Sequence, residues 1–252
     1  MPRARVITAL IAVVAASAAL TVGCSGAPDA SVPPSLSPSA GAEAAAPQVF
    51  DKSRLSIDDP ASIWVVTDKL RPLSPIDFVP PDLVDTPVAH VNSPALRSEA
   101  ADAVVGMFAA GAAEGAGAMQ LQSAYRSYAV QDRGYNGYVA SLGQAQADRQ
   151  SARPGHSEHQ TGLAIDVSPV PATCVIEECF GTTPQGAWLA ANSWRFGFIL
   201  RYPADKVEVT GFMYEPWHFR YVGVELATEM HDTGVSTLEE FFGLPAAPDY
   251  AG

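Results

Sequence analysis

Apolar residues recur with two periods along the chain, and these periods predict short helices and strands. In residues 95–113 the apolar positions fall on one helix face, and Gly115 and Gly117 end the pattern. Residues 119–123 alternate between apolar and polar side chains, as a half-buried strand does. Helices that precede a run of short strands joined by tight turns predict a single α+β domain with a small antiparallel sheet flanked by helices. Further helices are predicted at residues 128–143, 185–194, 223–231 and 237–242, and further strands at residues 64–66, 163–167, 198–201 and 218–222.

The first 23 residues have the pattern of a signal peptide, which would export the protein. Two arginines precede an uncharged apolar stretch at residues 6–22. A membrane anchor is the alternative, because a stretch of this length lies at the lower limit for spanning a bilayer. A small residue before Cys24 resembles a bacterial lipobox, so we predict lipidation at Cys24. Thr21 departs from the leucine usual in that motif, which leaves secretion without a lipid open.

Composition separates a tether from a globular domain. Residues 24–49 are rich in serine, proline, alanine and glycine, so they cannot bury enough apolar surface to offset chain entropy. We therefore predict a disordered tether there and one domain at residues 50–252.

The chain has 27 acidic against 15 basic residues and a net charge of −12, which disfavours nucleic-acid binding. Its three cysteines exclude a disulfide-dense scaffold.

Two short segments hold the candidate metal-ligating and catalytic side chains. His159 is predicted in a turn and Asp166 on the strand that follows, so the chain can aim both at one point. Glu215 and His218 lie three positions apart, and Pro216 between them excludes a helix interior. A catalytic zinc needs three protein ligands, an open fourth position and a nearby carboxylate. Two histidines, one aspartate and one free glutamate supply that set.

The complete pattern is similar to one enzyme family. Residues 157–166 read Ser-x-His-x-x-Gly-x-Ala-x-Asp, and Glu-x-x-His follows at residues 215–218. This combination resembles the VanY-type zinc D-alanyl-D-alanine carboxypeptidases, which are relatives of the VanX D-Ala-D-Ala dipeptidases. The segments Lys-Leu-Arg-Pro-Leu, Ser-Ala-Tyr-Arg-Ser and Gly-Phe-Ile-Leu-Arg-Tyr-Pro also match, so the resemblance covers roughly residues 62–243.

The resemblance implies a role for each motif residue. It implies that zinc is the cofactor, that the catalytic base is Glu215, and that Arg126 stabilises the oxyanion. A guanidinium suits that role because it stays charged at any working pH. The side chains implied to contact substrate are Gln131 and Ser157, and those implied to bind zinc are His159, Asp166 and His218.

Cys174 and Cys179 lie close in sequence, between the two halves of the predicted site. In an exported protein such a pair most often forms a disulfide, and we predict one here. The alternative is that both sulfurs bind zinc, although the two histidines and the aspartate already supply three zinc ligands.

The resemblance implies hydrolysis of the terminal D-Ala-D-Ala bond of peptidoglycan stem peptides. The same residues suit an L,D-carboxypeptidase or a D,D-dipeptidase, and a non-catalytic wall-binding lipoprotein is a third hypothesis. Glu215 argues against the third, because a binding protein needs no base there. We expect a monomer, anchored through Cys24 to the outer face of the cytoplasmic membrane and facing the cell wall.

Overall fold

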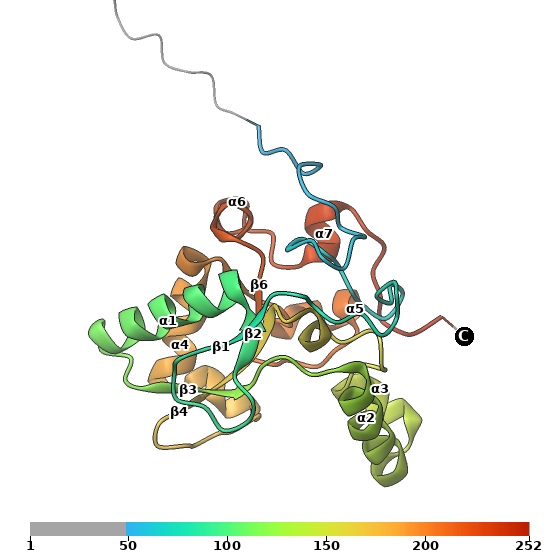
Figure 1. Ribbon diagram of the computed structural model, residues 1–252, viewed down its shortest axis with the longest axis horizontal. Coiled ribbons are helices and arrows are strands. Elements are labelled where there is room, and N and C mark those ends of the chain that lie inside the picture. Colours follow the sequence, from blue (N-terminus) through green and yellow to red (C-terminus); the bar gives the residue numbers. More distant parts are fainter. Residues whose placement is uncertain (1–48, 252) are drawn as a thin grey trace, which may run out of the picture. The chain divides into compact units, whose positions relative to one another are not determined.

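The computed structural model describes residues 49–251 (Figure 1). The predicted signal peptide, the predicted lipidation at Cys24 and the tether up to residue 48 lie outside the described residues. None of the helices within residues 49–251 is long and apolar enough to cross a membrane.

An antiparallel sheet with the strand order β3-β4-β6-β5 positions the candidate site. Successive strand side chains point to opposite faces, so Ile165 and Phe219 enter the main hydrophobic core. Asp166 and His218 therefore lie on the other face. The strands are β3 (Met119–Ser123), β4 (Ala164–Pro169), β5 (Phe198–Leu200) and β6 (His218–Tyr221), and a separate antiparallel pair is formed by β1 (Leu83–Asp85) and β2 (Ala95–Arg97).

Helices bury the core face of this sheet. From α1 (Ser98–Ala113), Val104 and Met107 are buried in the main core, and Leu189 reaches it from α4 (Pro184–Asn192). Thr183 caps α4 by accepting a hydrogen bond from the Gly186 amide, and Pro184 suits the first helical position. A second apolar cluster is formed by Trp64, α6 (Val224–Thr233) and α7 (Leu238–Phe242).

On the other side of the site, α2 (Tyr128–Leu142) and α3 (Gln144–Gln150) lie side by side (Figure 1). Gly143 separates them with a φ of 79°, a conformation that favours glycine. The remaining α-helix, α5 (Val207–Thr210), is a single turn. This arrangement of mixed helices and small antiparallel sheets confirms the predicted α+β class.

Two local predictions were wrong, and hydrogen bonding explains the first. Residues 64–66 are buried but form no strand, because the Arg220 guanidinium binds the carbonyls of Ile63 and Val65 that a neighbouring strand would need. Residues 95–97, predicted as helix, form strand β2 with β1, and α1 begins only at Ser98. Helix α3 was not predicted.

Candidate metal and active site

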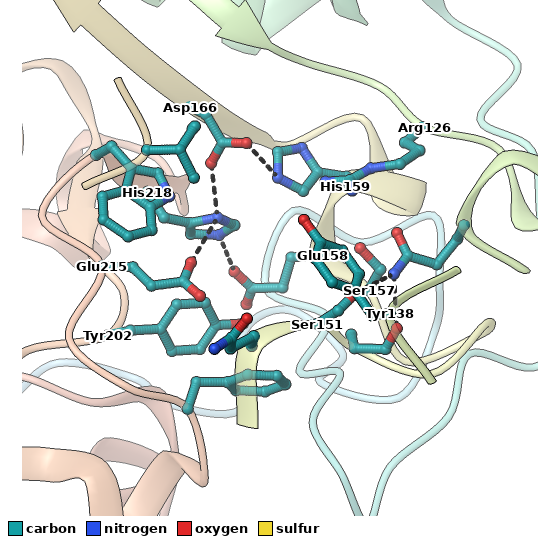
Figure 2. Close-up of a pocket in the computed structure, with 16 residues that line it drawn as sticks. Arg126, Tyr138, Ser151, Ser157, Glu158, His159, Asp166, Tyr202, Glu215 and His218 are labelled. Atoms are coloured by element: carbon teal, nitrogen blue, oxygen red, sulfur yellow. Dashed lines mark hydrogen bonds and ion pairs between the residues drawn. The ribbon is translucent and has the colours of Figure 1, made fainter. Parts of the chain in front are cut away.

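Three buried side chains converge on one point of the polar sheet face. Asp166 lies between the two histidines, with Oδ2 at 3.2 Å from His159 Nε2 and Oδ1 at 3.2 Å from His218 Nδ1 (Figure 2). Ligand atoms from all three residues lie within 4.8 Å of one another. The structure thus brings together the three residues predicted to bind metal.

Local backbone structure sets this convergence. Asp166 and His218 are direct cross-strand partners in the β4–β6 register. His159 belongs to η1 (Glu158–Thr161), a 3₁₀ turn that ends at Gly162 with a left-handed φ of 67°. That glycine turns the chain into β4, so His159 folds back over Asp166.

The donor set fits zinc. Neutral imidazole nitrogens and a carboxylate oxygen are ordinary zinc ligands, and each histidine has its second nitrogen engaged elsewhere. His159 Nδ1 donates to the Ala124 carbonyl at 2.8 Å, which leaves Nε2 free toward Asp166. His218 Nε2 lies 3.2 Å from Glu158 Oε2, which leaves Nδ1 toward Asp166.

Burial and neighbouring charge both perturb these groups. Burial raises the pKa of Asp166, but the imidazoles beside it outweigh burial and hold this pKa well below its usual range. Burial lowers the pKa of His159. Burial also lowers the pKa of His218. The hydrogen bonds to Asp166 and Glu158 outweigh burial and raise the pKa of His218 to about 9. A cation at His218 Nδ1 must displace that proton, so metal binding is coupled to proton release.

Glu215 lies beside the three-residue group without belonging to it. Its Oε2 is 3.9 Å from His218 Nδ1, and its backbone amide donates to the Tyr202 carbonyl at 3.1 Å. Burial raises the pKa of Glu215 to about 8. A carboxyl group with such a pKa can both accept and release a proton near neutral pH, as a general base and acid must.

Arg126, Gln131 and Ser157 line the same pocket (Figure 2). The Arg126 amide donates to the His159 carbonyl at 3.1 Å, which fixes the arginine next to a candidate ligand. Within residues 49–251, Arg126 Nε and Gln131 Oε1 are buried without a hydrogen-bond partner. Buried polar atoms are rarely left unpaired, so each of these two still has the capacity for one hydrogen bond. The positions match the predicted site, while the residues' roles stay predictions.

Glu158 is a buried residue of the site that the sequence analysis missed. Its Oε1 accepts from Arg201 Nε and from Arg220 Nη1, both at 2.8 Å, while Oε2 faces His218. Burial raises the pKa of Glu158, but the two guanidinium groups outweigh it and hold the pKa well below its usual range. The carboxylate is therefore ionised. Other pocket-lining residues that were missed are Tyr138, Gln150, Ser151, Ala152, Ile176, Tyr202 and Phe212.

Cys174 and Cys179 form a close pair in disulfide geometry, with Cα atoms 5.5 Å apart. With Glu177 they are also a second group of potential metal ligands. Cysteine sulfurs that are bonded to each other offer no thiolate to a metal. The disulfide stays a prediction, and so does its exclusion of the alternative zinc site.

Sequence comparison identifies the class of protein. The family model for VanY, D-alanyl-D-alanine carboxypeptidase, matches residues 93–224. The protein YodJ of Bacillus subtilis (strain 168), whose name marks it as a candidate carboxypeptidase, is 39% identical over 191 residues. That match covers 74% of this chain and 69% of YodJ. These matches, together with the fold and the site, place the chain in the class of carboxypeptidases.

Solved structures agree with this class. The LdcB LD-carboxypeptidase superposes with a TM-score of 0.67 at 39% identity, covering 73% of this chain and 87% of that one. A zinc complex of the D,D-pentapeptidase VanY from the VanB-type resistance cassette gives a TM-score of 0.60 at 32% identity, covering 71% and 98%. This chain belongs to the VanY family of D-alanyl-D-alanine carboxypeptidases.

Proposed function

We propose that this protein is a zinc-dependent D,D-carboxypeptidase that hydrolyses the terminal D-Ala-D-Ala bond of peptidoglycan stem peptides. One observation carries the proposal. His159, Asp166 and His218 are buried and converge on one point, while Glu215 lies beside them as a fourth, separate side chain. Three ligands with an adjacent base are the composition of a hydrolytic zinc site.

Each residue of the site has a separate role in the proposed hydrolysis. A zinc ion held by the three ligands supplies a Lewis acid that acidifies water and polarises a carbonyl oxygen. Glu215 accepts a proton from the attacking water and delivers a proton to the leaving amine. Arg126 holds a permanent positive charge beside the developing oxyanion and stabilises it. The buried setting strengthens both electrostatic effects, because solvent screens them less.

Two unpaired polar atoms of the pocket-lining residues support binding of a peptide end. Arg126 Nε can donate to a substrate oxygen, and Gln131 Oε1 can accept from a substrate amide. Gln131 itself is fixed, because its Nε2 donates to Ser151 Oγ at 3.1 Å and to the Ala152 carbonyl at 2.6 Å. Among the relatives, VanYB has been solved in complex with D-alanine-D-alanine, which supports a D-Ala-D-Ala peptide as the substrate class.

An L,D-carboxypeptidase is the second candidate, and one observation favours it. The LD-carboxypeptidase LdcB is 39% identical to this chain, against 32% for the zinc-bound VanY. Both activities need the same ligands and base, so the bond must be determined by experiment.

Mass spectrometry of defined stem peptides tests the proposal. The full chain, loaded with zinc, is incubated with tripeptide, tetrapeptide and pentapeptide stems and with free D-Ala-D-Ala. We expect the pentapeptide to lose one D-Ala, and the same sample treated with a chelator to lose none. Conversion of tetrapeptide to tripeptide alone would instead assign the L,D activity, and cleavage of the free dipeptide alone would assign the dipeptidase. No cleavage by a zinc-loaded protein would favour a non-catalytic wall-binding role.

We also propose that the protein works outside the cytoplasmic membrane as a lipid-anchored monomer. The signal-like residues 1–23, Cys24 and the tether support this location, and a stem peptide is accessible there. Cys24→Ala should abolish incorporation of labelled fatty acid and release the protein into the medium. Labelled fatty acid that persists in this variant would contradict lipidation at Cys24, and sedimentation of the purified chain tests the monomer.

A further inference from the structure

Glu158 precedes a candidate zinc ligand in sequence, yet its side chain contacts a different one. It begins η1, and only 1% of it is exposed. Its Oε2 lies 3.2 Å from His218 Nε2, on the opposite side of the imidazole from Asp166 (Figure 2). The catalytic steps proposed above give this buried carboxylate no task.

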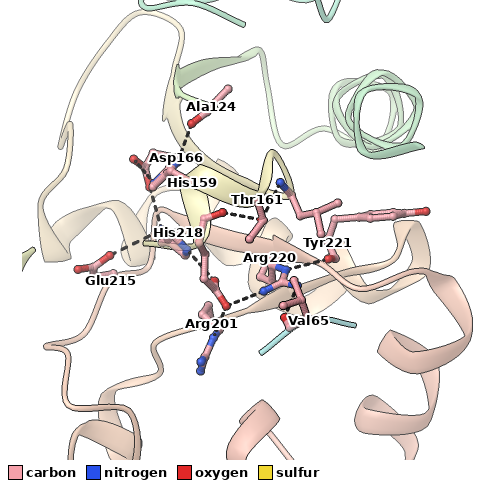
Figure 3. A network of polar contacts seen from close by, with 12 residues as sticks. Val65, Ala124, His159, Thr161, Asp166, Arg201, Glu215, His218, Arg220 and Tyr221 are labelled. Carbon is pink, nitrogen blue, oxygen red and sulfur yellow. Dashed lines mark hydrogen bonds and ion pairs between the residues drawn. The ribbon is translucent and has the colours of Figure 1, made fainter. Parts of the chain in front are cut away.

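The other carboxylate oxygen of Glu158 is committed to two cations. Arg201 Nε and Arg220 Nη1 both donate to Oε1, and both arginines are fully buried (Figure 3). Arg201 also donates to both oxygens of Glu239, at 3.0 and 2.7 Å. Arg220 is held by the carbonyls of Ile63 and Val65. The orientation of Glu158 is therefore fixed: Oε1 faces donors that never deprotonate, and Oε2 faces the histidine.

Both imidazole nitrogens of His218 face a carboxylate at 3.2 Å, Nδ1 facing Asp166 and Nε2 facing Glu158. Asp166 is itself a candidate metal ligand, so Glu158 is the partner that can keep a proton on the imidazole when a metal is bound. A carboxylate only accepts hydrogen bonds, so the imidazole must donate to it through Nε2–H. In the neutral imidazole that binds a metal, the Nδ1 lone pair takes the place of the proton shared with Asp166, and the remaining proton stays on Nε2. His159 is held in the complementary way, because its Nδ1–H donates to the Ala124 carbonyl and its Nε2 faces the metal position. Such outer partners fix the tautomer and ring orientation of histidine ligands.

We propose that Glu158 is a positioning residue of the metal site, which holds His218 as the Nε2–H tautomer with Nδ1 ready to bind zinc. The inference rests on the proposed zinc carboxypeptidase and deepens it. The two arginines have the role of keeping the carboxylate in one orientation. Strand β6 supplies both His218 and Arg220, so the ligand and the group that orients its partner move together.

Replacing Glu158 by glutamine separates this role from simple burial. The side chains of Arg201 and Arg220 are donors, so the single amide oxygen in the E158Q variant must turn toward them. The amide NH₂ group then faces His218 Nε2 and requires a lone pair there. The proton of the neutral imidazole moves to Nδ1, where it blocks the metal-binding lone pair. We expect the E158Q variant to bind zinc about 10–100-fold more weakly.

Glu239 provides the matched control. It is as buried as Glu158 and contacts Arg201, but none of its hydrogen bonds in residues 49–251 reaches a histidine. E239Q also replaces one buried carboxyl group of the network by an amide. We expect it to lower the thermal midpoint as E158Q does, while its zinc affinity stays that of the wild type.

The test titrates zinc into metal-free full-length wild type, E158Q and E239Q against a chromophoric chelator. Thermal unfolding is recorded in parallel, together with ¹⁵N NMR of the imidazoles at a pH high enough for His218 to be neutral. We expect weaker zinc binding in E158Q only, with the His218 proton on Nε2 in zinc-loaded wild type and on Nδ1 in metal-free E158Q. Equal zinc affinity of E158Q and wild type, or equal loss in E239Q, would overturn the inference.

The NMR measurement keeps the inference testable if E158Q does not fold. A zinc-loaded wild type whose His218 carries its proton on Nδ1 contradicts the proposed tautomer without any variant. The proposed function fails by a different result, namely a wild type that binds zinc and cleaves no stem peptide.

Discussion

Asp166 and His218 are paired directly across strands β4 and β6, and Asp166 Oδ1 lies 3.2 Å from His218 Nδ1. The pairing places the two candidate ligands on the same sheet face, opposite the core residues Ile165 and Phe219. A shift of one residue in this register would move one ligand to the core face. Packing of the core therefore also fixes the geometry of the candidate metal site.

Loss of any candidate ligand should remove most of the bound metal. His159→Ala, Asp166→Ala and His218→Ala each leave two ligands, so the zinc content of the purified protein should fall sharply. His156→Ala is the control, because His156 Nδ1 bonds to the Asp68 carbonyl instead of facing the site. Elemental analysis checks this. Full zinc content in all three ligand variants would remove the site assignment.

Arg126→Lys should impair catalysis without releasing zinc. A lysine keeps the positive charge but lacks the fixed guanidinium fork, and loss of one oxyanion donor typically costs about 10²–10³-fold in kcat. We expect a smaller loss, about 10–10²-fold in kcat/KM for a pentapeptide stem, because the charge remains. Arg133→Lys, at an exposed position of α2, is the control. A fully active Arg126→Lys enzyme would exclude the oxyanion role.

If the protein is exported as proposed, thiol labelling should find neither Cys174 nor Cys179 free when it is denatured without reduction. Both should react after reduction. The reason is that thiols held as a close pair in an oxidising compartment form a disulfide. Two reactive thiols before reduction would instead support the alternative in which these sulfurs bind metal.

Two glycines in helices should respond to alanine in opposite directions. A Cβ at Gly134 meets no atom within 4 Å, so Gly134→Ala should stabilise α2 and raise the free energy of unfolding by about 0.5–1 kcal/mol. A Cβ at Gly186 would lie 2.0 Å from the Phe180 carbonyl oxygen, so Gly186→Ala should lower the free energy of unfolding by about 1–3 kcal/mol. Denaturant unfolding measures both, and a destabilised Gly134→Ala would contradict the first.

The sequence was sufficient for most elements and for the residues that converge at the site. Strand β3 was predicted with its observed bounds, because Met119 to Gln122 alternate between apolar and polar side chains and Ser123 ends the pattern. Helix α2 was predicted within one residue, because Gly143 ends it. Residues 64–66 misled the prediction because an apolar run is equally compatible with a buried segment whose carbonyls bind a side chain, here that of Arg220.

Glu158 could not be assigned from the sequence. A glutamate at the start of a turn is ordinarily solvated, and nothing local indicates that this one is buried. Its partners Arg201 and Arg220 lie 43 and 62 positions away. Only the folded chain brings their guanidinium groups to its carboxylate, which offsets the cost of burying the charge.

Glu215→Gln, assayed for zinc content and for D-Ala release from a pentapeptide stem in one preparation, tests the central claim most directly. Glutamine keeps the size of the side chain but cannot accept the proton of the attacking water, and such acid–base help is typically worth about 10²–10⁴ in rate. Because Glu215 lies outside the ligand group, we expect full zinc content, an unchanged thermal midpoint and a loss of kcat of that size. Loss of zinc from the variant would make Glu215 a ligand, and full activity would contradict the hydrolytic mechanism.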